Sequence, residues 1–102
     1  MRIISGKAKG VRLAALNSKK TRPILDRAKE SMFSIIGDSI LDSVVLDLFA
    51  GTGSLGIEAL SRGAKRCLFV ENSTNAIKVI KKNLQNANLS KRTVVLKINA
   101  FR

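Results

Sequence analysis

Histidine, tyrosine and tryptophan are absent from this chain of 102 residues, and cysteine and proline each occur once. Without histidine, neither a Ser-His nor a Cys-His catalytic pair can form. A single thiol makes no intrachain disulfide, and with no histidine it provides too few ligands for a zinc site, so we expect no metal. Cys67 lies in an apolar stretch at residues 67–70, which predicts a buried core thiol in preference to a nucleophile.

Long apolar runs are also lacking. No segment approaches the roughly 18 to 20 apolar residues that cross a bilayer, and no apolar signal core follows Arg2. We therefore expect a cytoplasmic protein with no membrane partner. The length of 102 residues suits one small domain.

Acidic residues are scarce, with 7 against 19 basic ones and a net charge of +12. Residues 1–30 hold nine basic and two acidic side chains, and residues 72–102 hold seven basic and none acidic. A polyanion, most commonly nucleic acid, is the natural partner, although a basic surface that only aids solubility is the alternative. With four Phe and no other aromatic residue, base stacking on an aromatic platform is disfavoured. The basic residues that we expect to contact RNA are Arg2, Lys7, Lys9, Arg12, Lys19 and Lys20.

The chain divides into a basic N-terminal part, residues 1–38, and an alternating part, residues 39–102. Residues 1–20 predict a short basic β-hairpin or extended arm. Pro23 suits the first turn of a helix that Gly37 ends. The apolar face expected for this helix consists of Ile24, Ala28, Met32 and Ile36, widened by Leu25, Phe33 and Ile35. The face expected to be exposed holds Asp26, Arg27, Lys29 and Glu30.

Residues 39–102 predict the order β-α-β-α-β. Apolar strands are expected at 44–49, 66–71 and 93–98, and helices at 54–62 and from Ser73 or Thr74 onward. Strands this continuously apolar indicate a parallel sheet with helices on both faces, which makes the fold class α/β.

The turn at residues 51–56, GTGSLG, matches the pattern G-x-G-x-x-G between a predicted strand and a predicted helix. Gly51 permits the tight turn, Gly53 lets the backbone approach a ligand, and Gly56 lets helix and strand pack closely. Glu71 ends the next strand, where a carboxylate can accept hydrogen bonds from both hydroxyls of a ribose. The alternative is a tight turn without a ligand and a solvated Glu71.

Asp47, four residues before Gly51, distinguishes between two nucleoside cofactors. NAD would place a pyrophosphate over the turn and the helix N-terminus, where a nearby carboxylate repels it. S-adenosylmethionine brings a sulfonium and an ammonium, which the carboxylate attracts by several kcal/mol at ~4 Å in a partly buried site. The sequence therefore favours S-adenosylmethionine.

Residues 45–64, VLDLFAGTGSLGIEALSRGA, resemble the first motif of the RsmD family of bacterial rRNA methyltransferases. The start, RIISGK at 2–7 with Gly10, resembles the family's N-terminal arm, and TRP at 21–23 with Asp26, Arg27, Glu30 and Phe33 resembles its next motif. The resemblance implies a Rossmann-like class I methyltransferase fold, here a truncated three-layer half. It also implies methylation of a guanine N2 in small-subunit ribosomal RNA, either as free RNA or within a small-subunit particle.

The same resemblance places residues around the cofactor. Asp47, Gly51 and Gly53 would line its methionine end, Glu71 would hold the ribose, and Asn99 and Ala100 would lie beside the adenine. Many methyltransferases have Asp at the position of Asn99, whose amide can still hydrogen-bond the adenine. The cofactor-binding set comprises Asp47, Phe49, Gly51, Thr52, Gly53, Glu71, Asn72, Asn99 and Ala100. The residues expected at the mouth of the site, or alternatively on an exposed helix face, are Arg22, Asp26, Arg27 and Glu30.

The family's catalytic signature, Asp or Asn followed by Pro-Pro-Tyr or Pro-Pro-Phe, is absent, since Pro23 is the only proline. We therefore expect an N-terminal portion of an enzyme that has no catalytic residue and is inactive alone. Strand 44–49 would have an unpaired edge, for which we expect a homodimer, a swapped assembly, aggregation or a larger parent chain. The alternatives are a non-catalytic RNA-binding remnant, a pseudoenzyme or an NAD(P)-binding fragment.

Overall fold

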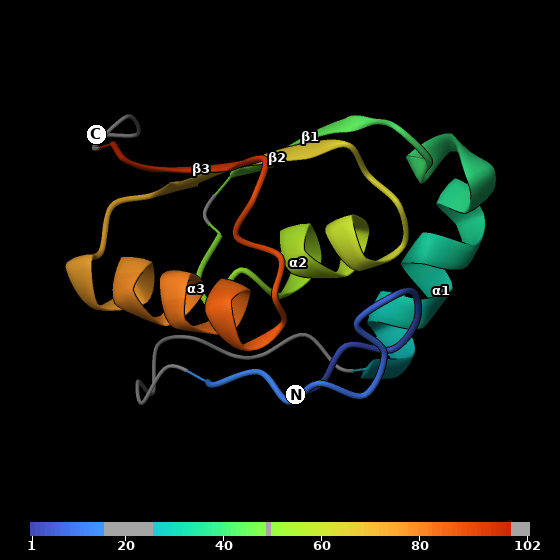
Figure 1. Ribbon diagram of the computed structural model, residues 1–102, viewed down its shortest axis with the longest axis horizontal. Coiled ribbons are helices and arrows are strands. Elements are labelled where there is room, and N and C mark those ends of the chain that lie inside the picture. The colour runs from blue at the N-terminus through green and yellow to red at the C-terminus, as the bar shows by residue number, and fades with distance from the viewer. Residues whose placement is uncertain (16–25, 49, 99–102) are drawn as a thin grey trace.

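The computed structural model of the chain describes residues 1–15, 26–48 and 50–98. Its elements follow the predicted β-α-β-α-β order after an N-terminal arm and a helix (Figure 1). The elements are α1 (Asp26–Ile36), the 3-10 helix η1 (Gly37–Ile40), β1 (Val44–Leu48), α2 (Ser54–Ser61), β2 (Arg66–Glu71), α3 (Thr74–Asn86) and β3 (Thr93–Lys97). The start of the helix predicted at Pro23 lies outside the described residues.

The three strands form a parallel sheet in the order β1-β2-β3. The register places Asp47 opposite Phe69 and Glu71 opposite Lys97. Because the carboxyl ends of parallel strands meet at one edge, Asp47 and Glu71 are brought to the same end of the sheet. Within the described residues, β1 pairs with β2 only, which confirms the unpaired edge that the sequence predicts.

Helices α2 and α3 lie side by side against one face of this sheet (Figure 1). The opposite face is open in the described part of the chain, where Leu46 is 56% and Val94 53% exposed. The expectation of helices on both faces is therefore wrong for these residues. Parallel strands connected in one direction across a sheet have right-handed crossovers, and both crossovers then place their helices on the same face.

The N-terminal arm passes beneath α2 and α3 and forms part of the main core (Figure 1). Its buried residues Ile3 and Leu13 belong to the same cluster as Ile57, Phe69 and Ile80. An antiparallel bridge joins Arg2 to Arg12, and the Ile3 N–H donates to the Val11 carbonyl at 2.9 Å. The predicted hairpin is thus present as one bridged pair around a wide turn.

Helix α1 buries only part of the face that the apolar pattern predicts, namely Phe33, and it also buries Lys29 from the face expected to be exposed. Lys29 and Phe33 are buried, whereas Ala28, Ile35 and Ile36 are exposed. The prediction that Lys29 faces solvent is wrong because its ammonium group has a carboxylate, a carbonyl and a hydroxyl group as partners inside the protein. Gly37 ends the α-helix as predicted, with a φ of 57°.

Candidate cofactor-binding site

The loop between β1 and α2 has the backbone geometry that its glycines allow. Gly51 and Gly53 have φ angles of 58° and 80°, in the left-handed region that side chains disfavour. The Gly53 N–H donates to the Ala50 carbonyl at 2.8 Å, and the Ala50 N–H donates to the Val70 carbonyl at 3.1 Å. The loop is therefore a tight turn attached to the end of β2, as the motif predicts.

The missing side chains at Gly53 and Gly56 both serve packing. A Cβ at Gly56 would lie 2.4 Å from Phe69 Cε1 and 2.7 Å from Cys67 Sγ, so the predicted close approach of helix and strand is confirmed. A Cβ at Gly53 would lie 3.2 Å from Ile57 and 3.3 Å from Ile80, on the inner side of the loop. The absence of a side chain at Gly53 therefore also serves core packing, and the close approach of its backbone to a ligand stays a prediction.

Glu71 links this loop to the start of α3. Its Oε1 accepts a hydrogen bond from the Gly51 N–H at 2.9 Å, and its Oε2 accepts from the N–H groups of Asn72 at 3.0 Å and Ser73 at 2.9 Å. A carboxylate has about four acceptor positions, so three donors leave room for a further one. The carboxylate is therefore fixed in place beside the loop while it retains capacity for a ligand hydroxyl.

Asp47 is a buried carboxylate immediately behind the loop. Burial raises its pKa from 3.8 to about 6, the Gly56 N–H opposes that rise through a 3.1 Å hydrogen bond to Oδ2, and the negative charge of Glu71 adds to it. A positive charge bound nearby would favour the ionised form. The site thus has a carboxylate whose charge has little compensation from the protein.

The underside of the loop is supported by α3, α1 and the arm. Asn83 is fully buried, and its Nδ2 donates to the Thr52 carbonyl at 3.0 Å while its Oδ1 accepts from the Ala14 N–H at 2.7 Å. Ser54 Oγ accepts from Lys29 Nζ at 3.1 Å. The bond to the Thr52 carbonyl holds the loop and the bond to Ser54 holds the start of α2, both from the buried side, while the bond to Ala14 attaches the arm to α3.

A buried ionic cluster around Glu58 joins α2 to the arm and to α1. The Glu58 carboxylate lies 3.3 Å from Lys29 Nζ and 2.8 Å from Arg62 Nε, and it accepts the N–H groups of Ile4 and Ser5 at 2.9 and 3.1 Å. The sequence reasoning missed Glu58, Lys29 and Asn83. The one available signal was the i,i+4 spacing of Glu58 and Arg62, which is typical of a helical ion pair.

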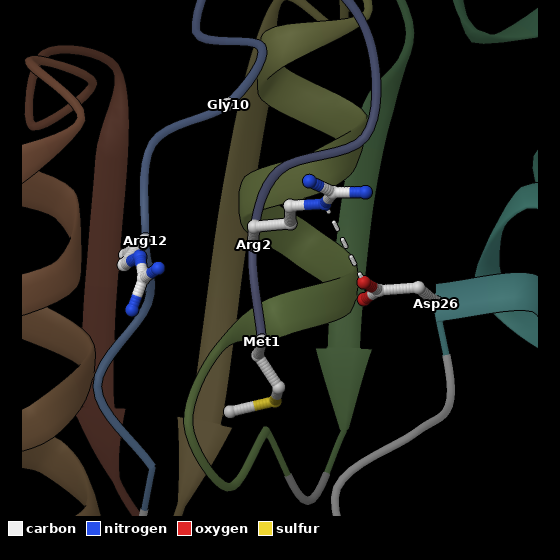
Figure 2. A pocket seen from close by; sticks show the side chains of 5 residues that line it. All are labelled: Met1, Arg2, Gly10, Arg12 and Asp26. Carbon is white, nitrogen blue, oxygen red and sulfur yellow. Dashed lines mark ion pairs between the residues drawn. The ribbon is translucent and has the colours of Figure 1, made fainter.

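The two sides of the arm enclose a hollow of 420 Å³ near the loop, lined by Met1, Arg2, Gly10, Arg12 and Asp26. Figure 2 shows Arg2 directed toward Asp26, at 3.7 Å between Arg2 Nε and Asp26 Oδ2, and Arg12 on the opposite side of the arm. Met1 lies beside the loop, with its Sδ 4.0 Å from Thr52 Oγ1. Two cationic side chains are therefore exposed next to the candidate site.

A family model described as "Conserved hypothetical protein 95" matches residues 1–102, the whole chain. The chain belongs to this family. The Bacillus subtilis protein YlbH is 47% identical over 102 residues, covering 100% of this chain and 55% of its own length. Ribosomal RNA small subunit methyltransferase D of Haemophilus influenzae is 47% identical over 90 residues, covering 88% of this chain and 47% of its own length. This chain thus spans about half the length of the curated relatives it matches.

This chain is similar to the solved structure of the putative methyltransferase yhhF from Escherichia coli, with a TM-score of 0.86 at 35% identity. The match covers 98% of this chain and 53% of that one. Together with the relatives, it confirms the resemblance to the RsmD family and the Rossmann-like class I methyltransferase fold.

The structure brings Asp47, Gly51, Thr52, Gly53 and Glu71 together at the carboxyl end of the sheet. Asn72 follows Glu71 and is exposed, and Arg27, Glu30, Lys7 and Lys9 are exposed on α1 and the arm. The predicted site residues outside the described part of the chain are Lys19, Lys20, Arg22, Phe49, Asn99 and Ala100.

Two further predictions concern metal and membrane. Within residues 1–15, 26–48 and 50–98, no three or more His, Cys, Asp or Glu side chains gather where they could hold a metal ion. Over the same residues, no helix has the length and apolar character that crossing a membrane requires.

Cys67 is buried as predicted. Burial, followed by the charge of Asp47, raises the pKa of its thiol to about 12.

Proposed function

We propose that this chain forms the S-adenosylmethionine-binding part of a methyltransferase that acts on small-subunit ribosomal RNA, at the N2 amino group of a guanine. The observation that best supports this function is the pair of carboxylates at the carboxyl ends of β1 and β2. Asp47 lies behind the glycine loop and Glu71 beside it, which suits a ligand that is cationic at one end and carries a ribose at the other. Membership of a family with members named rRNA methyltransferases supports the reaction class.

The residues present fit the cofactor chemically. Asp47, with its raised pKa, would gain from the sulfonium and ammonium groups, and Glu71 would accept hydrogen bonds from the ribose. When bound, the cofactor supplies an activated methyl group to an amine. The other residues that we assign to its binding are Phe49, Gly51, Thr52, Gly53, Asn72, Asn99 and Ala100.

NAD fits the same loop less well. Its pyrophosphate carries two negative charges, and the loop already has Asp47 behind it and Glu71 against the Gly51 N–H. Like charges about 4 Å apart in a partly buried site repel by several kcal/mol. This repulsion favours the cationic cofactor.

We assign RNA contacts to the arm residues, and substrate contacts to α1 and the segment before it. The RNA set consists of Arg2, Lys7, Lys9, Arg12, Lys19 and Lys20, and the mouth set consists of Arg22, Asp26, Arg27 and Glu30. The partner would be free ribosomal RNA or a small-subunit particle in the cytoplasm. Residues 1–38 would then act as an RNA-binding and lid region over the cofactor domain that begins at residue 39.

We assign no catalytic residue to this chain and expect it to show no turnover by itself. The unpaired edge of β1, with Val44, Leu46 and Leu48 exposed, is expected to promote a homodimer or a swapped assembly. Analytical ultracentrifugation over a range of concentrations measures this directly. A monomer at all concentrations would exclude the homodimer.

The cofactor assignment is tested by calorimetric titration with S-adenosylhomocysteine, with NAD as the comparison ligand. Asp47→Asn and Glu71→Gln are each expected to weaken binding about tenfold or more, or 1.4 kcal/mol. Asp38→Asn removes the same charge from an exposed position in η1 and is the matched control, expected to bind as the unmodified chain does.

Saturable binding of S-adenosylhomocysteine that depends on both carboxylates would support the proposal. Tight binding of NAD, or binding of S-adenosylhomocysteine that is unchanged in both variants of a folded chain, would contradict it. Circular dichroism of each variant separates loss of the site from loss of the fold.

A further inference from the structure

A second basic hollow lies at the amino-terminal end of the sheet, away from the glycine loop. It has a volume of 250 Å³ and is lined by Lys7, Lys65, Lys91, Arg92 and Asn88 over an apolar floor that includes Leu60. We call this hollow the amino-edge site. Of its cations, only Lys7 belongs to the RNA-binding set proposed above.

Parallel strand order accounts for this cluster. Lys65 immediately precedes β2 and Arg92 immediately precedes β3, and the amino ends of parallel strands meet at one edge. The arm adds Lys7, whose N–H donates to the Ser61 carbonyl at the end of α2 at 2.9 Å. Three segments that are distant in sequence therefore place their cations around one hollow.

Within the part of the chain that the structure describes, the cations of the amino-edge site form no ion pair with a carboxylate. All seven acidic residues of the chain lie within the described residues, and the ion pairs found there involve only Asp26 and Glu58. The carboxyl ends of α2 and α3 point to this end of the sheet, but each helix end is equivalent to roughly half a negative charge. Four cations against about one negative charge leave a surplus that an anion would neutralise.

We propose that the amino-edge site binds a phosphate group of the RNA substrate at a distance from the methylated nucleotide. This inference depends on the proposed function for the identity of its ligand. The six residues of β2 separate the two ends of the sheet by about 20 Å at 3.3 Å a residue. A strand within a duplex advances about 3.4 Å along the helix axis per nucleotide, the B-DNA value, so a base-paired strand that lies along the sheet spans this distance in about six nucleotides.

The arm connects the two basic regions. Arg2 and Arg12 line the hollow near the glycine loop, and Lys7, in the turn between them, lines the amino-edge site. One continuous RNA backbone could therefore follow the arm from the cofactor loop to the far end of the sheet. We take the substrate class to be an RNA helix that extends several base pairs beyond the target, and a helix shorter than about six base pairs would lack the second contact.

The test compares two double variants of the chain that lose the same charge. Lys65→Gln with Lys91→Gln removes two cations from the amino-edge site, and Lys78→Gln with Lys81→Gln removes two exposed cations from α3 as the control. Fluorescence polarisation measures binding to an RNA hairpin of about 12 base pairs and to one of about 4 base pairs, at several salt concentrations.

The amino-edge variant is expected to bind the long hairpin about tenfold more weakly, and its log-log salt slope should fall in magnitude by about 1 to 2. Its affinity for the short hairpin should equal that of the control variant. Equal losses in both double variants, or equal losses for both hairpins in the amino-edge variant, would overturn the proposal.

Titration of the same variants with S-adenosylhomocysteine separates this inference from the proposed function. Both variants should bind it as the unmodified chain does, since neither touches the cofactor loop. Failure of every form to bind it, with the length-dependent RNA result intact, would refute the cofactor and leave the phosphate site standing. Binding of S-adenosylhomocysteine by every form, without the length-dependent loss of RNA affinity in the amino-edge variant, would refute the phosphate site alone.

Discussion

Replacing Glu58 with alanine is expected to lower the free energy of unfolding by about 3–5 kcal/mol, the usual effect of removing one partner from a buried ion pair. Lys29 and Glu58 both have 0% side-chain exposure and lie 3.3 Å apart. Without Glu58, the Lys29 ammonium would keep only the Arg2 carbonyl at 2.8 Å and the Ser54 hydroxyl at 3.1 Å. Neither of these neutralises its charge.

The arm adds to this loss. The N–H groups of Ile4 and Ser5 both donate to the Glu58 carboxylate, and a buried donor left unpaired costs about 1–3 kcal/mol. Released arm residues can regain water, so this contribution overlaps with the first and does not simply add to it. A domain of 102 residues has a total stability of about 5–15 kcal/mol, so Glu58→Ala would remove a large fraction of it.

Urea denaturation followed by circular dichroism measures the loss, with Asp38→Ala as the exposed control. The double variant Lys29→Met with Glu58→Gln removes both charges and keeps an acceptor for one arm N–H, so it is expected to be more stable than Glu58→Ala. If Glu58→Ala does not fold, Glu58→Gln provides the same comparison. A loss below about 1 kcal/mol, the range of exposed ion pairs, would refute the reasoning.

Three further predictions concern the sheet and its loop. The pKa of Asp47 is raised to about 6, so its contribution to stability is full below pH 3.8 and is lost as the pH rises through 6. Asp47→Asn should therefore stabilise the ligand-free chain by about 2–3 kcal/mol at pH 7 and have little effect at pH 3.5, as thermal unfolding at the two pH values would show. If the cationic group of S-adenosylmethionine binds beside Asp47, binding should release the proton of Asp47, and the affinity should rise between pH 5 and 7. Calorimetry in two buffers measures both effects, and an affinity that does not change with pH would contradict this. Gly56→Ala should lower the free energy of unfolding by about 1–3 kcal/mol in urea denaturation, because the added methyl group meets Phe69 and Cys67, and an unchanged midpoint would exclude that contact.

The strands and the glycine turn could be predicted because their signals are local. The bounds of β2 agree with the sequence pattern, and Ser73, one of the two predicted caps, caps α3, its Oγ accepting from the Ala76 N–H at 3.3 Å. The glycine pattern likewise located the loop from the spacing of three residues. Local chemistry determines these features, so a short stretch of sequence is sufficient to find them.

The buried polar residues could not be predicted in the same way. Periodicity assigns Lys29 to an exposed face because a charged side chain is almost never buried without a partner. Its partner Glu58 lies on another helix, and the contacts of Asn83 with the arm span 69 residues. Only the tertiary structure shows that these groups meet. The packing of Gly53 against Ile80 could not be predicted for the same reason, since Ile80 lies on a different helix.

The hydrogen bonds that hold the arm connect residues far apart in the chain. The Ile4 N–H bonds to a side chain 54 positions later, and the Ala14 N–H to one 69 positions later. Closing loops of that length costs entropy before any contact compensates for it, so such contacts form late in folding. During synthesis the arm leaves the ribosome before α2 and α3, yet it can dock only after both helices have followed. The segment proposed to hold RNA would therefore be made before the two helices that it docks against and would become ordered after them.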